Sequence, residues 1–415
     1  MILLTIFMSS TDIVRFKSGL DFIGPYRVIL IITFILSIFY VICSKKIFKG
    51  RYLYLITLIF ISSPIAYIIS TNKEWAISSF LNDYMGLILI FLVCNFFKIE
   101  DFRLLLKTFI LSQLFTIIFS IYSYYMFYYG GGIQEQFNLL GIFNITLDKE
   151  FLLRAQISGM IRLSLPYATP PQLSMVMSIV ISILIGDNKI FTQKYRYLLI
   201  FIFFIILIFT QSRTGIIAMF ISIAIITMIK VFVKKRINIK YVLLICSVVV
   251  MGVIFILQSE SAFILKFISR FKVEDILQDR HLLVPLDGIL IWTSSFRYLF
   301  IGIGYGSSIN MIGKLTFLPP HFLNSFVTLI AEKGILGLLT VIELINIEIK
   351  LLKKTMTSNF DSAYVAISYA YLTMLISFIF YEGKQNIGVW VLISISIMIV
   401  SNMNRSNGGE EFELK

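Results

Sequence analysis

Long apolar runs separated by short polar connections dominate the chain. An α-helix needs about 20 apolar residues to cross roughly 30 Å of hydrocarbon, and no alternating period-two pattern of a β-barrel is present. The pattern therefore predicts a bundle of about eleven transmembrane helices. The expected spans lie near residues 28–43, 52–70, 77–97, 106–128, 172–187, 197–211, 214–230, 241–257, 324–349, 363–381 and 387–402.

Composition supports the same class. Of the 415 residues, 58% are hydrophobic and only 14% are charged, which is too little polar surface for a water-soluble fold of this size. We expect one all-α integral membrane domain over 1–415. The short apolar run Met1–Met8 would be an interfacial helix, a half-span or part of a twelfth crossing, and it lacks the basic flank and cleavage site of a signal peptide.

Cysteine usage argues against a disulfide framework or a zinc site. Cys43, Cys94 and Cys246 all lie inside apolar runs, with no CxxC spacing and no nearby histidine. We expect neither a bound metal nor a cofactor.

Lysine and arginine cluster in every second connection, which predicts that those connections are cytoplasmic. The clusters lie near residues 45–51, 98–107, 189–196, 230–240 and 350–354. The net charge of +13 is thus a topology signal, and nucleic-acid binding is not expected.

Two outward segments are much longer than the other connections, at 129–171 and 258–323. Loops of this length are usually functional or flexible. Against the positive-inside trend, both carry arginines: Arg154, Arg162, Arg270, Arg280 and Arg297. In the second loop, the spacing of apolar residues over 263–271 predicts an amphipathic helix at the membrane interface.

A polar stripe marks the helix that follows the second loop. Its residues recur at helical spacing and would share one face: His321, Asn324, Ser325, Thr328 and Glu332. A charged group at membrane depth costs roughly 2.5–3.5 kcal/mol on insertion scales, so such a face normally lines a cavity or meets a partner. Pro319 and Pro320 precede the stripe and Gly334 and Gly337 follow it, which predicts a broken helix.

Two arginines are candidates for binding an anion at the outer surface. Arg162 begins the proline-rich piece RLSLPYATPP, and Arg213 lies in the tight outward turn TQSRTG. Each has a structural alternative, because a surface arginine before a helix and polar residues that cap helix ends are common. The planar guanidinium nevertheless suits bidentate contact with phosphate.

The sequence GIGYG at 302–306 is not a dinucleotide fingerprint, because no strand–turn–helix pattern surrounds it. We interpret it as a flexible loop.

Three stretches together resemble the O-antigen polymerase and O-antigen ligase superfamily of membrane glycosyltransferases. They are SRTG at 212–215, the run from Trp292 through GIGYG, and NSFVTLIAEKGILGLL at 324–339. The segment from Arg162 to Leu173 is similar more weakly. The resemblance covers most of 150–350, whereas the other spans match only in hydropathy.

The resemblance implies a glycosyltransferase of the bacterial inner membrane whose active site faces the periplasm. Its partners would be the bilayer and an undecaprenyl-diphosphate-linked oligosaccharide, with a chain-length-regulating membrane protein as a further candidate. Arg213 and Arg162 would hold the donor diphosphate, and His321 or Glu332 would act as base. Arg280 and Asn324 complete the expected substrate-binding residues. The family commonly has histidine directly before the asparagine, where this chain has Leu323.

Several alternatives stay open. We favour a polymerase of repeat units for O-antigen or capsule-type polysaccharide over a ligase that transfers the chain to lipid A core. A flippase for lipid-linked oligosaccharides would instead predict an internal repeat and polar residues near the bilayer midplane. For Glu332, the alternative to a role as base is a structural one, in which it pairs with Lys333 or Arg213 only to neutralise buried charge.

Overall fold

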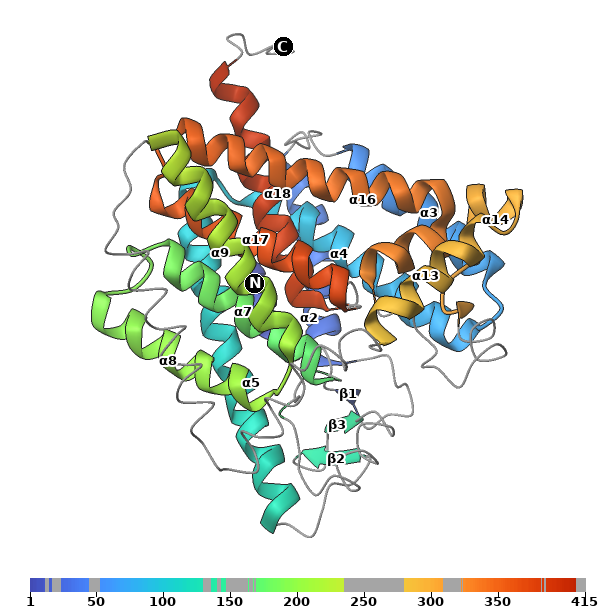
Figure 1. Ribbon diagram of the computed structural model, residues 1–415, viewed down its shortest axis with the longest axis horizontal. Helices are drawn as coiled ribbons and strands as arrows, with labels where there is room; N and C mark the ends of the chain where they lie inside the picture. The colour runs from blue at the N-terminus through green and yellow to red at the C-terminus, as the bar shows by residue number, and fades with distance from the viewer. Residues whose placement is uncertain are drawn as a thin grey trace.

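The structure is a computed structural model of the chain. It describes residues 1–11, 15–16, 24–44, 53–129, 136–139, 143–146, 163, 167, 169–234, 280–308, 322, 324–381, 383 and 386–407. The long helices are α2 (Pro25–Ser44), α3 (Leu53–Ile69), α4 (Lys73–Phe96), α5 (Phe102–Tyr129), α7 (Pro170–Gly186), α8 (Gln193–Phe209), α9 (Arg213–Lys234), α13 (Arg280–Thr293), α16 (Ser325–Thr357), α17 (Ser362–Phe380) and α18 (Ile387–Asn407) (Figure 1). The short helices are α1 (Ile2–Met8), η1 (Ser9–Thr11), η2 (Ile99–Asp101) and α14 (Phe296–Ile301).

The helical class is confirmed. Every predicted span coincides with a helix except 241–257, which lies outside the described residues. The only strands in the described part are β1 (Arg15–Phe16), β2 (Gln136–Leu139) and β3 (Phe143–Thr146), which form a small antiparallel sheet in the order β1-β3-β2, with Phe16 opposite Phe143.

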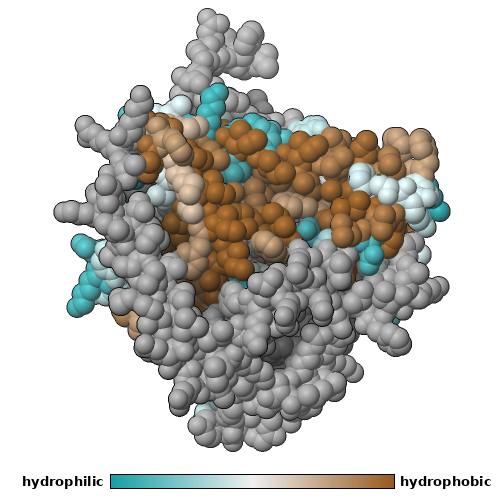
Figure 2. All heavy atoms as spheres, viewed as in Figure 1, coloured by the Kyte–Doolittle hydropathy of each residue, from teal (hydrophilic) through white to brown (hydrophobic). Residues whose placement is uncertain are grey.

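Several helices are long and apolar enough to cross a membrane. By length and composition, five stretches of the described part qualify: α2, α4, Ile99–Tyr122, most of α9, and α17. Large apolar side chains on them remain exposed, such as Ile42 on α2 and Phe232 on α9. Figure 2 shows that apolar residues cover much of one face of the bundle. These features indicate a membrane protein.

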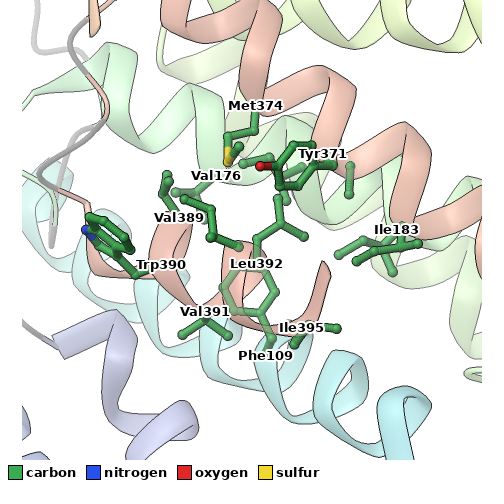
Figure 3. Close-up of a cluster of buried hydrophobic side chains, with 14 of the residues drawn as sticks. Phe109, Val176, Ile183, Tyr371, Met374, Val389, Trp390, Val391, Leu392 and Ile395 are labelled. Carbon is green, nitrogen blue, oxygen red and sulfur yellow. The ribbon is translucent and has the colours of Figure 1, made fainter. Parts of the chain in front are cut away.

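The core is built by α7 packed on α17 and by α18 packed on α4, with α5 beside them. Figure 3 shows Phe109 of α5, Ile183 of α7 and Tyr371 of α17 converging on Leu392 of α18. Small residues let the backbones approach closely, as is typical of membrane helices. A Cβ atom on Gly186, for example, would lie 2.3 Å from the Cα atom of Ala366.

One end of the bundle is held by the buried carboxylate of Asp187, which follows α7. It accepts a hydrogen bond from Arg103 Nε of α5 at 2.8 Å and one from the hydroxyl of Ser362, which begins α17, also at 2.8 Å. We call this the Asp187 end. The pattern of lysine and arginine predicts that the connections after α4, α7 and α16 face the cytoplasm, and the structure brings them together.

At the opposite end of the bundle, the N-terminal ends of α7 and α16 lie beside the C-terminal end of α17. The hydroxyl groups of Thr169 and Tyr381 lie 2.5 Å apart, and the hydroxyl of Ser325 donates to the carbonyl of Tyr381 at 2.9 Å. The turn between α8 and α9, which contains Arg213, joins them because Gly215 packs on Ser174 of α7. We call this the Arg213 end.

The predicted break in α16 is present at Gly334. Its φ and ψ angles are 60° and −139°, which end the helical hydrogen bonding locally. Two backbone carbonyls released near the break, those of Ala331 and Glu332, accept hydrogen bonds from the amides of Ile303 and Gly304 at 2.8 and 3.1 Å. The loop that contains GIGYG therefore replaces the missing helical partners.

Replacing Gly334 by alanine should destabilise the protein. The backbone conformation is one that L residues rarely adopt, at a strain of about 1–3 kcal/mol, and a Cβ atom would lie 2.5 Å from the backbone of Phe300. We expect a lower thermal unfolding midpoint for purified Gly334→Ala protein. Gly388→Ala is the control, because the nearest atom there is a side-chain oxygen at 3.1 Å. Equal midpoints for the two variants would contradict the prediction.

Candidate functional site

The polar stripe at the start of α16 is divided between two roles. Asn324 is the N-cap: its Oδ1 atom accepts from the amides of Phe326 and Val327 at 2.9 and 3.0 Å, and its Nδ2 atom donates to the carbonyl of Ile379 at 2.7 Å. Thr328 donates to the carbonyl of Asn324 at 2.8 Å. Asn324 thus joins α16 to α17. Glu332 lies about 12 Å along the helix from Asn324.

Glu332 is buried against the glycine-rich loop. Its Oε1 atom accepts a hydrogen bond from the backbone amide of Gly306 at 2.8 Å, and only 3% of the residue is exposed. A carboxylate that accepts an amide hydrogen bond in a buried place compensates for part of its lost hydration. Glu332 thus fixes the loop to α16.

The loop of residues 302–308 is not flexible, contrary to the sequence-based expectation. All seven residues are buried. Besides its bonds to α16, the amide of Tyr305 donates to the carbonyl of Ala66 at 3.0 Å, and the hydroxyl of Ser70 donates to the carbonyl of Tyr305 at 2.5 Å. Gly304, with a φ of +88°, lets the loop pass Ser70, since a Cβ atom would lie 2.7 Å from that residue's backbone. The loop is therefore wedged between α3 and α16.

A buried charged cluster lies next to this loop, and the sequence pattern does not predict it as a unit. Lys333 Nζ lies 2.5 Å from Asp83 Oδ2, and both residues are at least nine-tenths buried. The same carboxylate oxygen accepts from the hydroxyl of Ser63 at 2.8 Å and from that of Tyr305. The ammonium group lies 5.4 Å from the centre of the Tyr305 ring. We call Asp83, Lys333, Ser63 and Tyr305 the Asp83 cluster.

The electrostatics of the Asp83 cluster favour a neutral tyrosine beside an ion pair. The Tyr305 hydroxyl donates its hydrogen bond to Asp83 Oδ2, the same oxygen that lies against Lys333 Nζ. The cluster ties α3, α4, the loop and the broken part of α16 together, which a set of apolar contacts would do with less geometric definition.

A small cavity adjoins this cluster. Its volume is about 20 Å³, enough for a water molecule, and its walls include Asp83, Lys333 and Thr340 among apolar side chains such as Trp390. It is too small for a sugar. In the described part of the chain, no three His, Cys, Asp or Glu side chains lie close enough to hold a metal ion.

Arg213 begins α9 at the Arg213 end of the bundle. Hydroxyl groups within the preceding turn order it. The amide of Ser212 donates a hydrogen bond to Thr210 Oγ1 at 3.2 Å, and the hydroxyls of Ser212 and Thr214 lie 2.9 Å apart. Gln211 adopts a positive φ of 50° to make the turn tight. The guanidinium group is therefore carried by a rigid turn at a helix N-terminus, where the helix dipole also favours an anion.

The segment around Arg162 approaches the same turn. The amide of Leu163, the next residue in the sequence, donates to the carbonyl of Phe209 at the end of α8, at 3.2 Å. Arg162 and His321 themselves lie outside the described residues. Arg280 is the first residue of α13, and its side chain is also outside the description.

The structure thus places the predicted site residues in two groups. Three residues belong to the Arg213 end: Arg213 itself, Asn324, and Leu163, which follows Arg162 in the sequence. Glu332 lies deeper along α16, next in sequence to Lys333 of the Asp83 cluster, and accepts its hydrogen bond from Gly306. The sequence did contain a signal for that cluster, because Asp83 is an acidic residue inside the predicted span 77–97 and such residues are expensive in a membrane.

Comparison with known proteins does not identify the chain. No protein-family model matches the sequence, and no curated protein is significantly similar to it.

The Asp83–Lys333 pair should show strong energetic coupling. Lys333→Met alone leaves a buried carboxylate without its counter-charge, and loss of one partner of a buried pair typically costs about 3–5 kcal/mol. In Asp83→Asn/Lys333→Met both charges are gone and the amide still accepts from Ser63. We expect the double variant to unfold at a higher temperature than Lys333→Met, measured on purified protein in detergent. If the loss of stability in the double variant equals the sum of the losses in Asp83→Asn and Lys333→Met, the two residues do not act as a pair.

Proposed function

We propose that this protein is a glycosyltransferase of the bacterial inner membrane that polymerises oligosaccharide repeat units carried on undecaprenyl diphosphate. The active site would face the periplasm at the Arg213 end of the bundle. The product would be an O-antigen or capsule-type polysaccharide. The proposal rests on the superfamily resemblance of 212–215, 292–306 and 324–339 together with the arrangement of these segments in the bundle.

One observation carries the proposal. The residue after Arg162 is hydrogen-bonded to the end of α8, four residues before Arg213, so two arginine-bearing segments that are far apart in the sequence meet at one end of the bundle. Cleavage of a glycosyl diphosphate builds negative charge on the leaving diphosphate. Fixed guanidinium groups can stabilise that charge without a metal ion.

The acceptor side of the reaction needs a base for the attacking hydroxyl group, and proton transfer typically contributes about 10²–10⁴-fold. Glu332 is engaged with Gly306 below the Arg213 end, and Asn324 is engaged in capping α16. His321, three residues before that cap in the sequence, is therefore the base that the proposal favours. Glu332 would instead hold the wall of the site in place.

A second candidate function is supported by the break in α16. Discontinuous helices with buried charges at membrane depth are typical of transporters, and Asp83 and Lys333 fit that description. A flippase for the same lipid-linked oligosaccharide would use the Asp83 cluster rather than Arg213. The two functions therefore predict different sensitive residues.

Arg213→Ala should abolish polymerisation while leaving the amount of folded protein unchanged, because the side chain lies at the end of the bundle rather than in the core. The assay is chain extension of lipid-linked repeat units by purified protein. Arg196→Ala is the matched control, since Arg196 lies at the other end of α8. Arg213→Lys should retain part of the activity, because it keeps the charge but loses the bidentate fork. Normal chain length and yield with Arg213→Ala would refute the mechanism.

Deletion of the gene separates the enzyme alternatives. A surface glycolipid with core plus one repeat indicates a lost polymerase, whereas core without repeats indicates a lost ligase. An unchanged ladder on the gel would argue against both.

A further inference from the structure

The segment 280–308 runs along α16 rather than away from it. Gly288 of α13 packs on Val327, close to the start of α16, since a Cβ atom there would lie 2.5 Å from the Val327 side chain. Twelve residues later, the backbone of Phe300 in α14 abuts Gly334 with the same spacing. Val327 and Gly334 are about 10 Å apart along the helix. The chain therefore descends from the Arg213 end by about that depth.

The chain then returns toward the side from which it came. The amide of Ile303 donates a hydrogen bond to the carbonyl of Ala331, which is closer than Gly334 to the start of α16. The hydroxyl of Ser307 accepts a hydrogen bond from the amide of Thr71 at 3.0 Å. Thr71 lies in the connection between α3 and α4, which the charge pattern predicts to face outward. The segment thus enters and leaves on one side. Figure 1 shows α13 and α14 together beside one end of α16.

The helices of this hairpin carry large apolar side chains on two faces. One face packs on α16 through Val284 and partly buried Trp292 and Tyr298. The other face exposes a stripe of large apolar side chains, with Leu290 66% and Phe296 81% exposed. The remaining exposed members are Leu286, Ile289, Phe300 and Ile301. Figure 2 shows apolar surface over α16 that continues over α13.

Backbone hydrogen bonding in the hairpin follows the rule for chain segments inside a bilayer. Irregular backbone is tolerated there only where protein buries it, and residues 302–308 are all buried. The exposed turn between α13 and α14 satisfies its hydroxyls internally: Thr293 donates to the carbonyl of Ile289 at 3.0 Å, and Ser294 donates to that of Ile291 at 2.7 Å. The indole of Trp292 likewise donates to the carbonyl of Leu299 at 3.1 Å.

Arg297 is an exposed charged residue of this hairpin. It lies at the start of α14, one turn before Phe300. The long side chain of an arginine can extend along apolar surface and bring its guanidinium to lipid phosphates. Its position in the sequence is thus compatible with an element that dips only part of the way into the membrane.

We propose that residues 280–308 form a re-entrant hairpin whose apolar face contacts the hydrocarbon of the outer leaflet. The occupant of this face is lipid, because the face is continuous with the apolar surface of α16 and the irregular backbone of residues 302–308 is buried inside the protein. This inference goes beyond the proposed function and does not depend on it. It places in the bilayer a segment that the sequence analysis assigns to an extramembrane loop.

Site-directed spin labelling in proteoliposomes tests the proposal. The three cysteines are first replaced, and single cysteines are then introduced as Leu290→Cys and Phe296→Cys. Ile35→Cys, on an exposed apolar position of α2, is the lipid control, and Lys73→Cys, at the outward start of α4, is the water control. Collision with oxygen reports lipid, and collision with a water-soluble nickel chelate reports water.

We expect the labels at positions 290 and 296 to match the Ile35 control, with high oxygen and low nickel accessibility. Labels that match the Lys73 control would overturn the proposal, since the hairpin would then lie in water. The readout needs no enzymatic activity, so its outcome is separate from that of the polymerisation assay. Correct insertion is checked in every sample by the response of the two controls.

Discussion

The break in α16 at Gly334 is the feature on which the rest of this structure depends. A helix that is interrupted in apolar surroundings exposes backbone carbonyls that lipid cannot solvate, and each unsatisfied group costs several kcal/mol. Here the amides of Ile303 and Gly304 satisfy the carbonyls of Ala331 and Glu332. The loop must therefore enter the bundle, and the positive-φ glycines allow its backbone to come close enough. The hairpin α13–α14 is the consequence, because it carries the chain to that depth.

The Asp83 cluster follows from the same constraint. Once the loop lies between α3 and α16, the Tyr305 hydroxyl reaches Asp83, and Lys333, next to the break, supplies the opposite charge. A buried ion pair contributes little net stability, because desolvation offsets most of the attraction. What it does contribute is a definite geometry, since an alternative packing would leave a charge unpaired. The cluster thus selects one arrangement of the broken helix.

The Arg213 end has a different character. Its contacts are hydroxyl and carbonyl hydrogen bonds between helix ends, as between Thr169, Tyr381 and Ser325, and they leave charged side chains such as Arg213 at the margin of the bundle. A binding surface for an anionic lipid headgroup requires such charges where solvent and bilayer meet. The division between a rigid, neutralised interior and an end that carries Arg213 is what the proposed transfer of a diphosphate-linked sugar would need.

The sequence by itself determined the helical class, the positions of the long described helices outside 258–323, the alternation of the two ends and the break at Gly334. These properties depend on local composition: apolar runs of membrane-spanning length, basic connections and a glycine that follows two charged residues. Only the tertiary structure decided that the loop at 302–308 is buried, that Lys333 pairs with Asp83 and that Glu332 accepts a hydrogen bond from Gly306. Such pairings join residues hundreds of positions apart, and hydropathy is the same whichever partner a buried charge finds. The sequence could indicate that Asp83 needed a partner, but only packing could specify which one.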